Sequence, residues 1–172
     1  MICRCNREVV IKLIPKQWFI KYLDLKEEFL AKGKELKWFP EHMRVRYENW
    51  IKGLQWDWSL SRQRFFGVPF PLWYCAKCSE IIAAKEEQLP VDPLQGKPPV
   101  QKCPKCGAEE FVPEKDVMDT WATSSLTPQI NSQWGVDGKR HKKIFPMSLR
   151  PQAHDIITLW AFNTIVNAYF NE

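Results

Sequence analysis

Features that mark membrane and exported proteins are missing from this sequence of 172 residues. No apolar run reaches the roughly 18 residues that a membrane-spanning helix requires, so no such helix is predicted. The first residues, MICRCNREVV, lack the apolar segment of a signal peptide. Without an export signal the chain is expected to be cytoplasmic. Its six cysteines are then better explained as metal ligands or free thiols than as disulfides.

The composition also argues against a disordered chain. Hydrophobic residues make up 45% of the sequence, with nine Trp and ten Phe, which is enough to form a buried core. The length suits one sizeable domain with a small additional module. The net charge is +5, with the Lys and Arg residues scattered along the chain. This charge is compatible with binding a polyanion and is equally typical of a solvated surface.

Four cysteines form two C-x-x-C turns, and no other internal repeat is evident. Cys75 and Cys78 form the first turn, and Cys103 and Cys106 form the second after an interval of 24 residues. Zinc prefers four such ligands at tetrahedral positions about 2.3 Å away, and each turn supplies two of them. Four unrelated buried thiols are the alternative, but the doubled spacing favours zinc. Because four protein ligands leave no open position, the zinc is predicted to be structural.

Three lysines near these turns and two cysteines near the start of the chain also bear on metal binding. Lys77, Lys102 and Lys105 are placed to offset the negative charge of four thiolates around one divalent ion. Cys3 and Cys5 have C-x-C spacing near the start of the chain. They are either half of a second metal site, completed by cysteines outside this chain, or they bind nothing.

Hydrophobic patterns predict two helices early in the chain, between short strands in residues 7–22 and 56–74. In the first helix Asp24 is the expected N-cap and Gly33 the expected stop. The second begins near Pro40 and ends near Gly53. Its apolar residues recur at helical spacing and define one face, made of Met43, Tyr47, Trp50, Ile51 and Leu54.

The composition and the predicted structure change twice in the later part of the chain. Residues 75–115 are rich in Pro, Lys and Cys, with few large apolar side chains, and are interpreted as an inserted module. Residues 132–148 are predicted to form a polar loop. An amphipathic helix is predicted from about His154 to Tyr169, with apolar residues Ile156, Ile157, Leu159, Trp160, Ile165 and Val166.

Four stretches in order give a more specific indication. They are KQWFIKYLDLKEEFL, RYENWIKGLQWDWSLSRQRFFGVPFPLWYC, DVMDTWATSSLTPQ and LRPQAHDIITLWAFNTIV. Together they resemble the catalytic domain of class I aminoacyl-tRNA synthetases of the valine, isoleucine and leucine group, and most closely the archaeal-type valine enzymes. The resemblance implies an α/β fold: the C-terminal half of a Rossmann-type catalytic domain, with an inserted zinc ribbon. Residues 1–74 and 116–172 would belong to the catalytic domain, and residues 75–115 to the ribbon.

The resemblance assigns two tryptophans to an amino-acid pocket. In this family one tryptophan follows an Asp-Thr pair and another lies on the later helix, and the two flank the amino-acid side chain. They correspond here to Trp121 and Trp160. Two flat indoles offer a branched aliphatic group a large contact area at little entropic cost. The alternative is that both are core aromatic residues.

The segment PQAHD stands where the family has a turn that cradles the ribose and the aminoacyl-adenylate. Gln152, Ala153, His154 and Asp155 are therefore expected to face the adenylate. Backbone N–H groups at the start of a helix, at the ligand-binding edge of a parallel sheet, suit this role. Ala153 replaces the glycine of many relatives and restricts the backbone. Alternatively, Asp155 only caps the helix and His154 is a core histidine.

Basic residues elsewhere have two interpretations each. Within the element SRQR, Arg64 is suited to bind phosphate. Arg62 either takes part in the site or braces the backbone between two halves of the domain. The stretch GKRHKK, residues 138–143, either contacts tRNA phosphates or is a solvated loop, which is the commoner outcome for such a charge run.

The resemblance implies a fragment of a valine-tRNA ligase, for which the full enzyme uses valine, ATP with Mg²⁺, and tRNA. Isoleucine or leucine specificity is the close alternative, since one methylene changes binding by only about 1–3 kcal/mol. The alternative from another functional class is a binding module and not an enzyme fragment: a stand-alone zinc ribbon that binds RNA or protein. The chain is either a piece of a longer catalytic domain or a separately encoded remnant. Apolar surface left exposed where the missing half would dock favours self-association.

Two elements that the family uses for adenylation do not occur in this sequence. One is the HIGH-type element and the other is the KMSKS-type loop, and the histidines His42, His141 and His154 are isolated. No catalytic residue is therefore assigned to this chain.

Because phosphoryl transfer depends on such positioned charges, we expect this chain alone to show no valine-dependent exchange between ATP and pyrophosphate. The measurement is incorporation of labelled pyrophosphate into ATP, with and without valine. Exchange above the background without valine would contradict this expectation.

Overall fold

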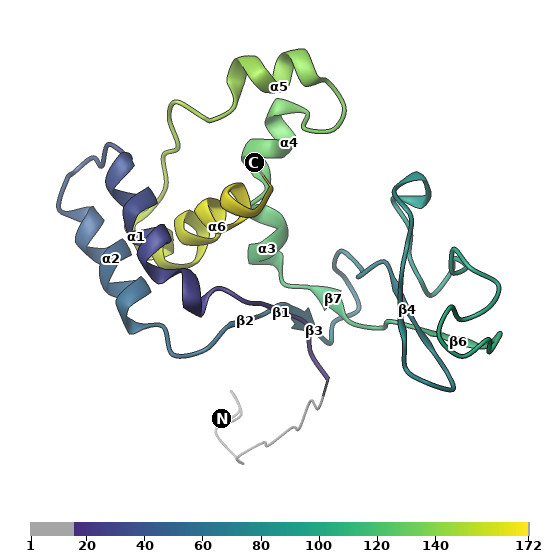
Figure 1. Ribbon diagram of the computed structural model, residues 1–172. Helices are drawn as coiled ribbons and strands as arrows, with labels where there is room; N and C mark the ends of the chain where they lie inside the picture. The colour runs from purple at the N-terminus through teal and green to yellow at the C-terminus, as the bar shows by residue number, and fades with distance from the viewer. Residues whose placement is uncertain (1–15, 172) are drawn as a thin grey trace.

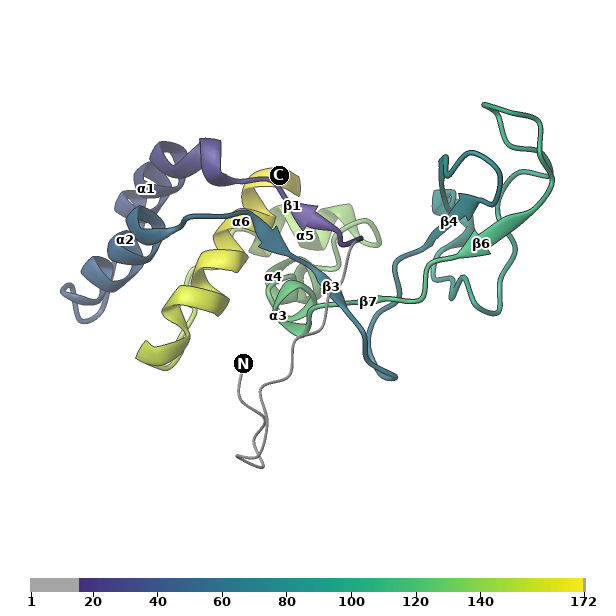
Figure 2. The same ribbon diagram turned by 90° about the horizontal axis from the view of Figure 1, so that it is seen from below.

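The computed structural model describes residues 16–171, so Cys3, Cys5 and the strands expected before Lys16 lie outside the described residues. The described chain forms a helical body and a separate lobe that carries the four cysteines (Figure 1). Figure 2 shows the same separation from a second direction, with two extended segments joining the lobe to the body. The part of the chain that carries the four cysteines is therefore set apart from the helical body.

The elements are short and alternate along the chain. The strands are β1 (Phe19–Ile20), β2 (Trp58–Ser59), β3 (Ser61–Arg62), β4 (Leu72–Cys75), β5 (Ile81–Ala83), β6 (Phe111–Pro113) and β7 (Val117–Met118). The α-helices are α1 (Lys26–Glu35), α2 (Met43–Gly53), α3 (Thr120–Ser124), α4 (Thr127–Ser132), α5 (Gly138–Ile144) and α6 (Phe162–Asn171). The remaining helical turns are η1 (Leu23–Leu25), η2 (Glu86–Gln88), η3 (His154–Ile156) and the π-helix η4 (Ile157–Ala161).

Three small antiparallel sheets organise the strands. In the body β1 pairs with β2, and β3 pairs with β7, where Ser61 faces Met118. In the lobe β4 lies between β5 and β6. No parallel strand pair occurs within residues 16–171, so a Rossmann-type sheet is not seen in this part of the chain. The observed content is mixed α and β, as expected.

The core of the body is an aromatic cluster between α1, α2 and the last helix. Phe29 packs edge-on against Phe162 and Tyr22, and Tyr47 lies 6.2 Å from Phe162 between ring centroids. The apolar face predicted for α2 is confirmed. Tyr47 and Ile51 are fully buried, and Met43, Trp50 and Leu54 pack against the same cluster. Edge-to-face rings of this kind bury large areas and fix the helix orientations.

The prediction for the first helix was wrong at both ends. Asp24 lies in the turn η1, and the residue before α1 is Leu25, whose side chain makes no capping hydrogen bond. Gly33 does not end α1, which continues to Glu35. Gly33 is buried, and a Cβ built there would lie 2.3 Å from the Tyr47 ring. The glycine is therefore explained by close helix packing, a contact that local sequence rules do not detect.

The polar loop predicted over residues 132–148 was also wrong in part. Residues Gly138–Ile144 form the helix α5, because the Asp137 side chain accepts 3.0 Å hydrogen bonds from the N–H groups of Lys139 and Arg140. This is an ordinary N-cap arrangement with an acidic residue at the positive end of a helix. The last predicted helix is present in three parts, which are η3, η4 and α6.

No helix within residues 16–171 has both the length and the apolar character needed to cross a membrane.

The Gly33 contact predicts that Gly33→Ala destabilises the chain by about 1–3 kcal/mol, because the new methyl group must displace the Tyr47 ring. Gly53→Ala is the matched control. A Cβ at Gly53 meets nothing within 4 Å, so helix propensity predicts an unchanged or slightly higher stability. Urea unfolding of both variants measures the difference. Equal stabilities would contradict the packing explanation.

Candidate functional site

The two cysteine turns have the same backbone geometry. The N–H of Cys75 donates to the carbonyl of Glu80, and the N–H of Cys103 donates to the carbonyl of Ala108, five residues on in both cases. The fourth residue after each first cysteine has positive φ, 58° at Ser79 and 73° at Gly107. Two matched turns therefore present their sulfur atoms in the same way, as repeated metal-binding turns do.

The four sulfur atoms converge on one point between the turns. Sγ of Cys75 lies 3.5 Å from Sγ of Cys106, and Sγ of Cys78 lies 3.6 Å from Sγ of Cys103. All four lie within 4.8 Å of one another. A tetrahedral ion with bonds of about 2.3 Å needs sulfur separations of about 3.8 Å. The separations are too long for disulfides and fit a single metal ion.

The surroundings act differently on the two cysteines of the first turn. A hydrogen bond from the N–H of Glu80 lowers the pKa of Cys78, but burial and the neighbouring cysteines prevail and raise it to about 12. A hydrogen bond from the N–H of Cys78 lowers the pKa of the Cys75 thiol, whereas burial raises it. The hydrogen bonds prevail, so the pKa of Cys75 is lowered.

Lys105 and Lys102 were expected to offset thiolate charge. Glu80, and after it the nearby Cys78 and Cys103, raise the pKa of Lys105. Both lysines also have an acidic partner. Lys105 lies 2.9 Å from Glu80. Lys102 lies 3.2 Å from Glu109. Their main contacts are therefore exposed ion pairs around the cluster.

A polar contact attaches the lobe to the body. The indole N–H of Trp18 donates to Tyr74 Oη and to Glu114 Oε2, each at 3.1 Å, and the Tyr74 hydroxyl donates to Glu114 at 2.6 Å. Burial and this hydrogen bond raise the pKa of Tyr74 to about 12. Since Trp18 precedes β1 whereas Tyr74 and Glu114 belong to the lobe, the three groups fix where the lobe leaves the body.

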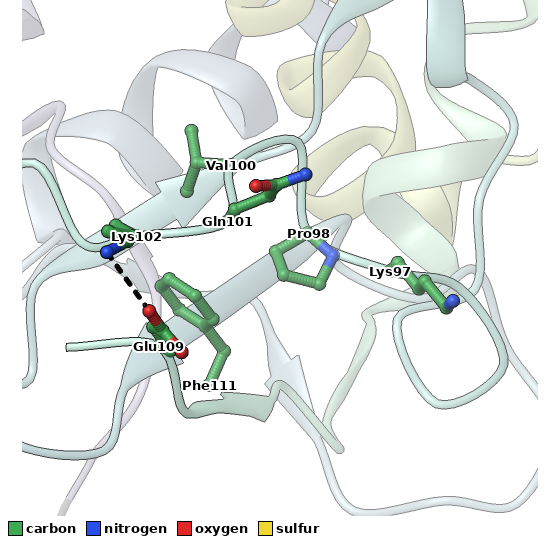
Figure 3. Close-up of a pocket in the computed structure, with 7 residues that line it drawn as sticks. All are labelled: Lys97, Pro98, Val100, Gln101, Lys102, Glu109 and Phe111. Atoms are coloured by element: carbon green, nitrogen blue, oxygen red, sulfur yellow. Dashed lines mark ion pairs between the residues drawn. The ribbon is translucent and has the colours of Figure 1, made fainter.

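Two pockets of the structure lie on or beside this lobe. One, of about 570 Å³, is lined partly by Phe111 and by Lys102, which pairs with Glu109 (Figure 3). The second, of about 380 Å³, lies at the junction and includes Tyr74 and Glu114. Neither pocket includes the two tryptophans assigned to the amino-acid site.

Asp119 is the buried acidic group at the start of α3. It is 5% exposed, and its carboxylate forms an ion pair with Arg62 of β3. It also accepts the N–H of Trp121 at 3.0 Å and the indole N–H of Trp58 at 3.4 Å. The carboxylate therefore caps α3 and joins that helix to β2 and β3 at once.

Arg62 has the bracing geometry. One of its nitrogens donates to the carbonyls of Ser59 and Ser61 at 2.9 Å, while the other pairs with Asp119. The neighbouring Gln63 donates to Asp116 at 2.8 Å. The SRQ element and the DVMDTW element are thus tied together side by side. Arg64 is exposed beside them.

Trp121 lies on α3 and Trp160 on η4, and these two elements contact each other. The indole N–H of Trp160 donates 3.2 Å to the carbonyl of Ser124, one turn after Trp121 on α3. The Trp121 carbonyl accepts the Ser125 hydroxyl, and Asn167 donates 2.9 Å to the same hydroxyl oxygen. Both indoles are half-buried. The fold therefore brings the two elements that carry these distant residues into contact.

The residues of PQAHD lie at the end of a loop. Ala153 precedes the three-residue turn η3 and makes no side-chain cap, and His154 and Asp155 are exposed. His154 is therefore not a core histidine, and Asp155 does not cap the helix. Gln152 is half-buried, and its Oε1 has no hydrogen-bond partner among residues 16–171. His154 and Asp155 are therefore available on the surface, whereas the Oε1 atom of Gln152 is buried.

The basic stretch of α5 is exposed at Lys139, Arg140, Lys142 and Lys143. His141 is half-buried, with its Nδ1 2.8 Å from the Ser132 hydroxyl. A capped basic helix replaces the expected solvated loop.

Sequence reasoning missed the polar groups that hold the tryptophans. Arg150 lies over the Trp160 ring, and Thr164 and Asn167 follow Trp160 at helical spacing. A polar stripe at intervals of four and three residues within an apolar helix was the available signal. Nothing in the local sequence indicated Arg150.

Comparison with known proteins identifies the group to which these features belong. The family model described as tRNA synthetases class I (I, L, M and V) matches residues 4–170. A valine--tRNA ligase from Thermoplasma acidophilum is 54% identical over 98% of this chain and 21% of its own length. One from Haloarcula marismortui is 51% identical over 96% of this chain and 19% of its own. The chain thus spans about a fifth of these relatives.

A solved structure is also similar. It is the ternary complex of Agrobacterium radiobacter K84 agnB2 LeuRS-tRNA-LeuAMS, with 28% identity and a TM-score of 0.47. The similarity covers 64% of this chain and 16% of that one.

The sulfur geometry predicts about one equivalent of zinc in freshly purified protein, measured by elemental analysis. Cys78→Ser should lower the zinc content because an alcohol is a poor replacement for a thiolate ligand. Chelation should unfold the lobe while leaving the helical circular dichroism of the body largely intact. The double variant Cys3→Ser, Cys5→Ser is the control and should retain one equivalent. Metal-free wild-type protein would contradict the prediction.

Proposed function

Because this chain belongs to the class I tRNA synthetases, we propose that it forms the amino-acid and adenylate side of a valine-tRNA ligase active site. The identity of 54% to a valine--tRNA ligase over 98% of the chain carries the proposal. Since the chain spans about a fifth of that relative, activation and transfer would belong to the longer protein. ATP with Mg²⁺, valine and tRNA would be its substrates, and this chain would bind part of them.

The amino-acid pocket would be formed by Trp121 and Trp160. Support comes from their positions on two elements in contact, α3 and η4, where the Ser124 carbonyl accepts the Trp160 indole N–H. Half-buried indoles leave apolar surface for a small branched side chain. The valine side chain would gain contact area there, while the polar network behind the rings keeps them in place.

The adenylate would lie against the segment Gln152, Ala153, His154 and Asp155. The exposure of the last three residues supports this, as does the acceptor atom of Gln152 that lacks a partner among residues 16–171. Neutral amide and hydroxyl groups are suited to ribose recognition. Ala153 has an ordinary extended conformation, with φ of −70°, so the replacement of glycine by alanine is compatible with the backbone here.

The lobe would be a zinc ribbon inserted in the catalytic domain. Cys75, Cys78, Cys103 and Cys106 would hold one Zn²⁺ with no open position, so the ion stabilises the lobe and supplies no chemistry. Residues 75–115 would form the ribbon, and residues 1–74 and 116–172 would belong to the Rossmann-type domain. The antiparallel strands described here would then lie beside parallel strands formed elsewhere in the longer protein.

The pocket can be tested with a non-hydrolysable valyl-adenylate analogue in titration calorimetry. Trp121→Ala and Trp160→Ala are each expected to weaken binding about tenfold or more, because large contact area is lost. Trp56→Ala is the control, since Trp56 is 72% exposed between α2 and β2, and it should leave the affinity unchanged. Equal affinity of all three variants and the wild type would refute the pocket.

A further inference from the structure

The guanidinium of Arg150 stacks on the indole of Trp160. The Cζ atom lies 3.8 Å from the ring centroid, which is the separation of a close cation–π contact. Arg150 precedes the PQAHD segment and is separated from Trp160 by the turn η3. The stacked guanidinium covers one face of the indole, so a ligand can reach only the opposite face and the ring edge.

Two threonines link the same guanidinium to the groups that hold Trp160. Its Nη2 donates to Thr164 Oγ1 at 2.9 Å, and the Thr164 hydroxyl donates to the Trp160 carbonyl at 2.7 Å. Nη2 also lies 3.0 Å from Thr127 Oγ1. These contacts fix the guanidinium relative to the backbone that carries Trp160.

Thr127 completes the network on the far side. Its hydroxyl donates to the Ser124 carbonyl at 2.9 Å, and this carbonyl also accepts the Trp160 indole N–H. Arg150 is thus linked to the indole N–H through Thr127 and Ser124, and to the Trp160 backbone through Thr164. A ring held at its face, its N–H and its backbone has little freedom to rotate.

The chemistry of the network requires arginine. Burial lowers the pKa of Arg150 from its ordinary value, but an arginine remains charged at neutral pH. Its planar fork can stack and donate at once, whereas the point charge of lysine cannot do both. Trp160 also lies in a π-helix, a distortion that is frequent at functional sites.

We propose that Arg150 is a positioning residue of the amino-acid pocket, which fixes the orientation of Trp160 and leaves one indole face for the substrate side chain. This inference rests on the proposed function, because it gives the held ring a ligand. A ring free to rotate would change the shape of the pocket, and one methylene, the difference between valine and isoleucine, changes discrimination by only about 10- to 200-fold. Arg150 therefore contributes to discrimination between these two side chains without touching either.

The first measurement follows the ring itself. In protein labelled with ¹⁵N-tryptophan, the Trp160 indole resonance, assigned with Trp160→Phe, should be slow to exchange with solvent in the wild type. Arg150→Met and Arg150→Lys should both shift it and speed its exchange at least tenfold. Arg46→Met is the matched control, since Arg46 is exposed on α2. Each variant is compared at equal fraction folded, from its urea unfolding curve. An unshifted, slowly exchanging indole in Arg150→Met overturns the proposal.

The second measurement compares valyl- and isoleucyl-adenylate analogues. Arg150→Met should reduce the ratio of the two affinities at least threefold, while Arg46→Met should leave the ratio unchanged. If the wild type binds and Arg150→Met shows the same ratio, the role of Arg150 is overturned and the proposed function stands. If the wild type binds neither analogue, the proposed function fails and the pocket role of Arg150 fails with it. Thr164→Val, which removes one link and keeps the charge, should give an intermediate ratio.

Discussion

The buried carboxylate of Asp119 holds together the parts of the chain from which the candidate site is built. It caps α3 at Trp121 and pairs with Arg62 of β3. A buried carboxylate is unfavourable unless it is paired and hydrogen-bonded, and here it accepts from a backbone N–H, an indole and a guanidinium. The position of α3 depends on this pairing, and the contact between α3 and the last helix depends on the position of α3.

A second polar network continues this arrangement toward the last helix. Asn167 donates to the Ala122 carbonyl and to Ser125, while Arg150 and Thr164 hold Trp160 from the other side. The aromatic core beneath, with Phe29 and Phe162 at its centre, supplies the apolar burial. In the body, aromatic packing therefore fixes the helices, and hydrogen bonds fix the ring positions at the site.

The lobe depends on a different kind of interaction. It has a three-stranded sheet and two matched turns, and its sulfur cluster takes the place of a large apolar core. Small modules of this kind commonly need a metal ion to fold. Trp18, Tyr74 and Glu114 attach the lobe to the body, so the lobe is held at its base by hydrogen bonds between residues that are far apart in the sequence.

The sequence by itself determined the features that depend on local spacing. Two C-x-x-C turns predict converging sulfur atoms, and the helical spacing of Tyr47 and Ile51 predicts a buried face, because backbone geometry sets both. Only the tertiary structure decided why Gly33 is a glycine, that Asp119 pairs with Arg62, and that Arg150 lies on Trp160. Each of these contacts joins different elements, and local periodicity in the sequence cannot identify which distant residue is the partner.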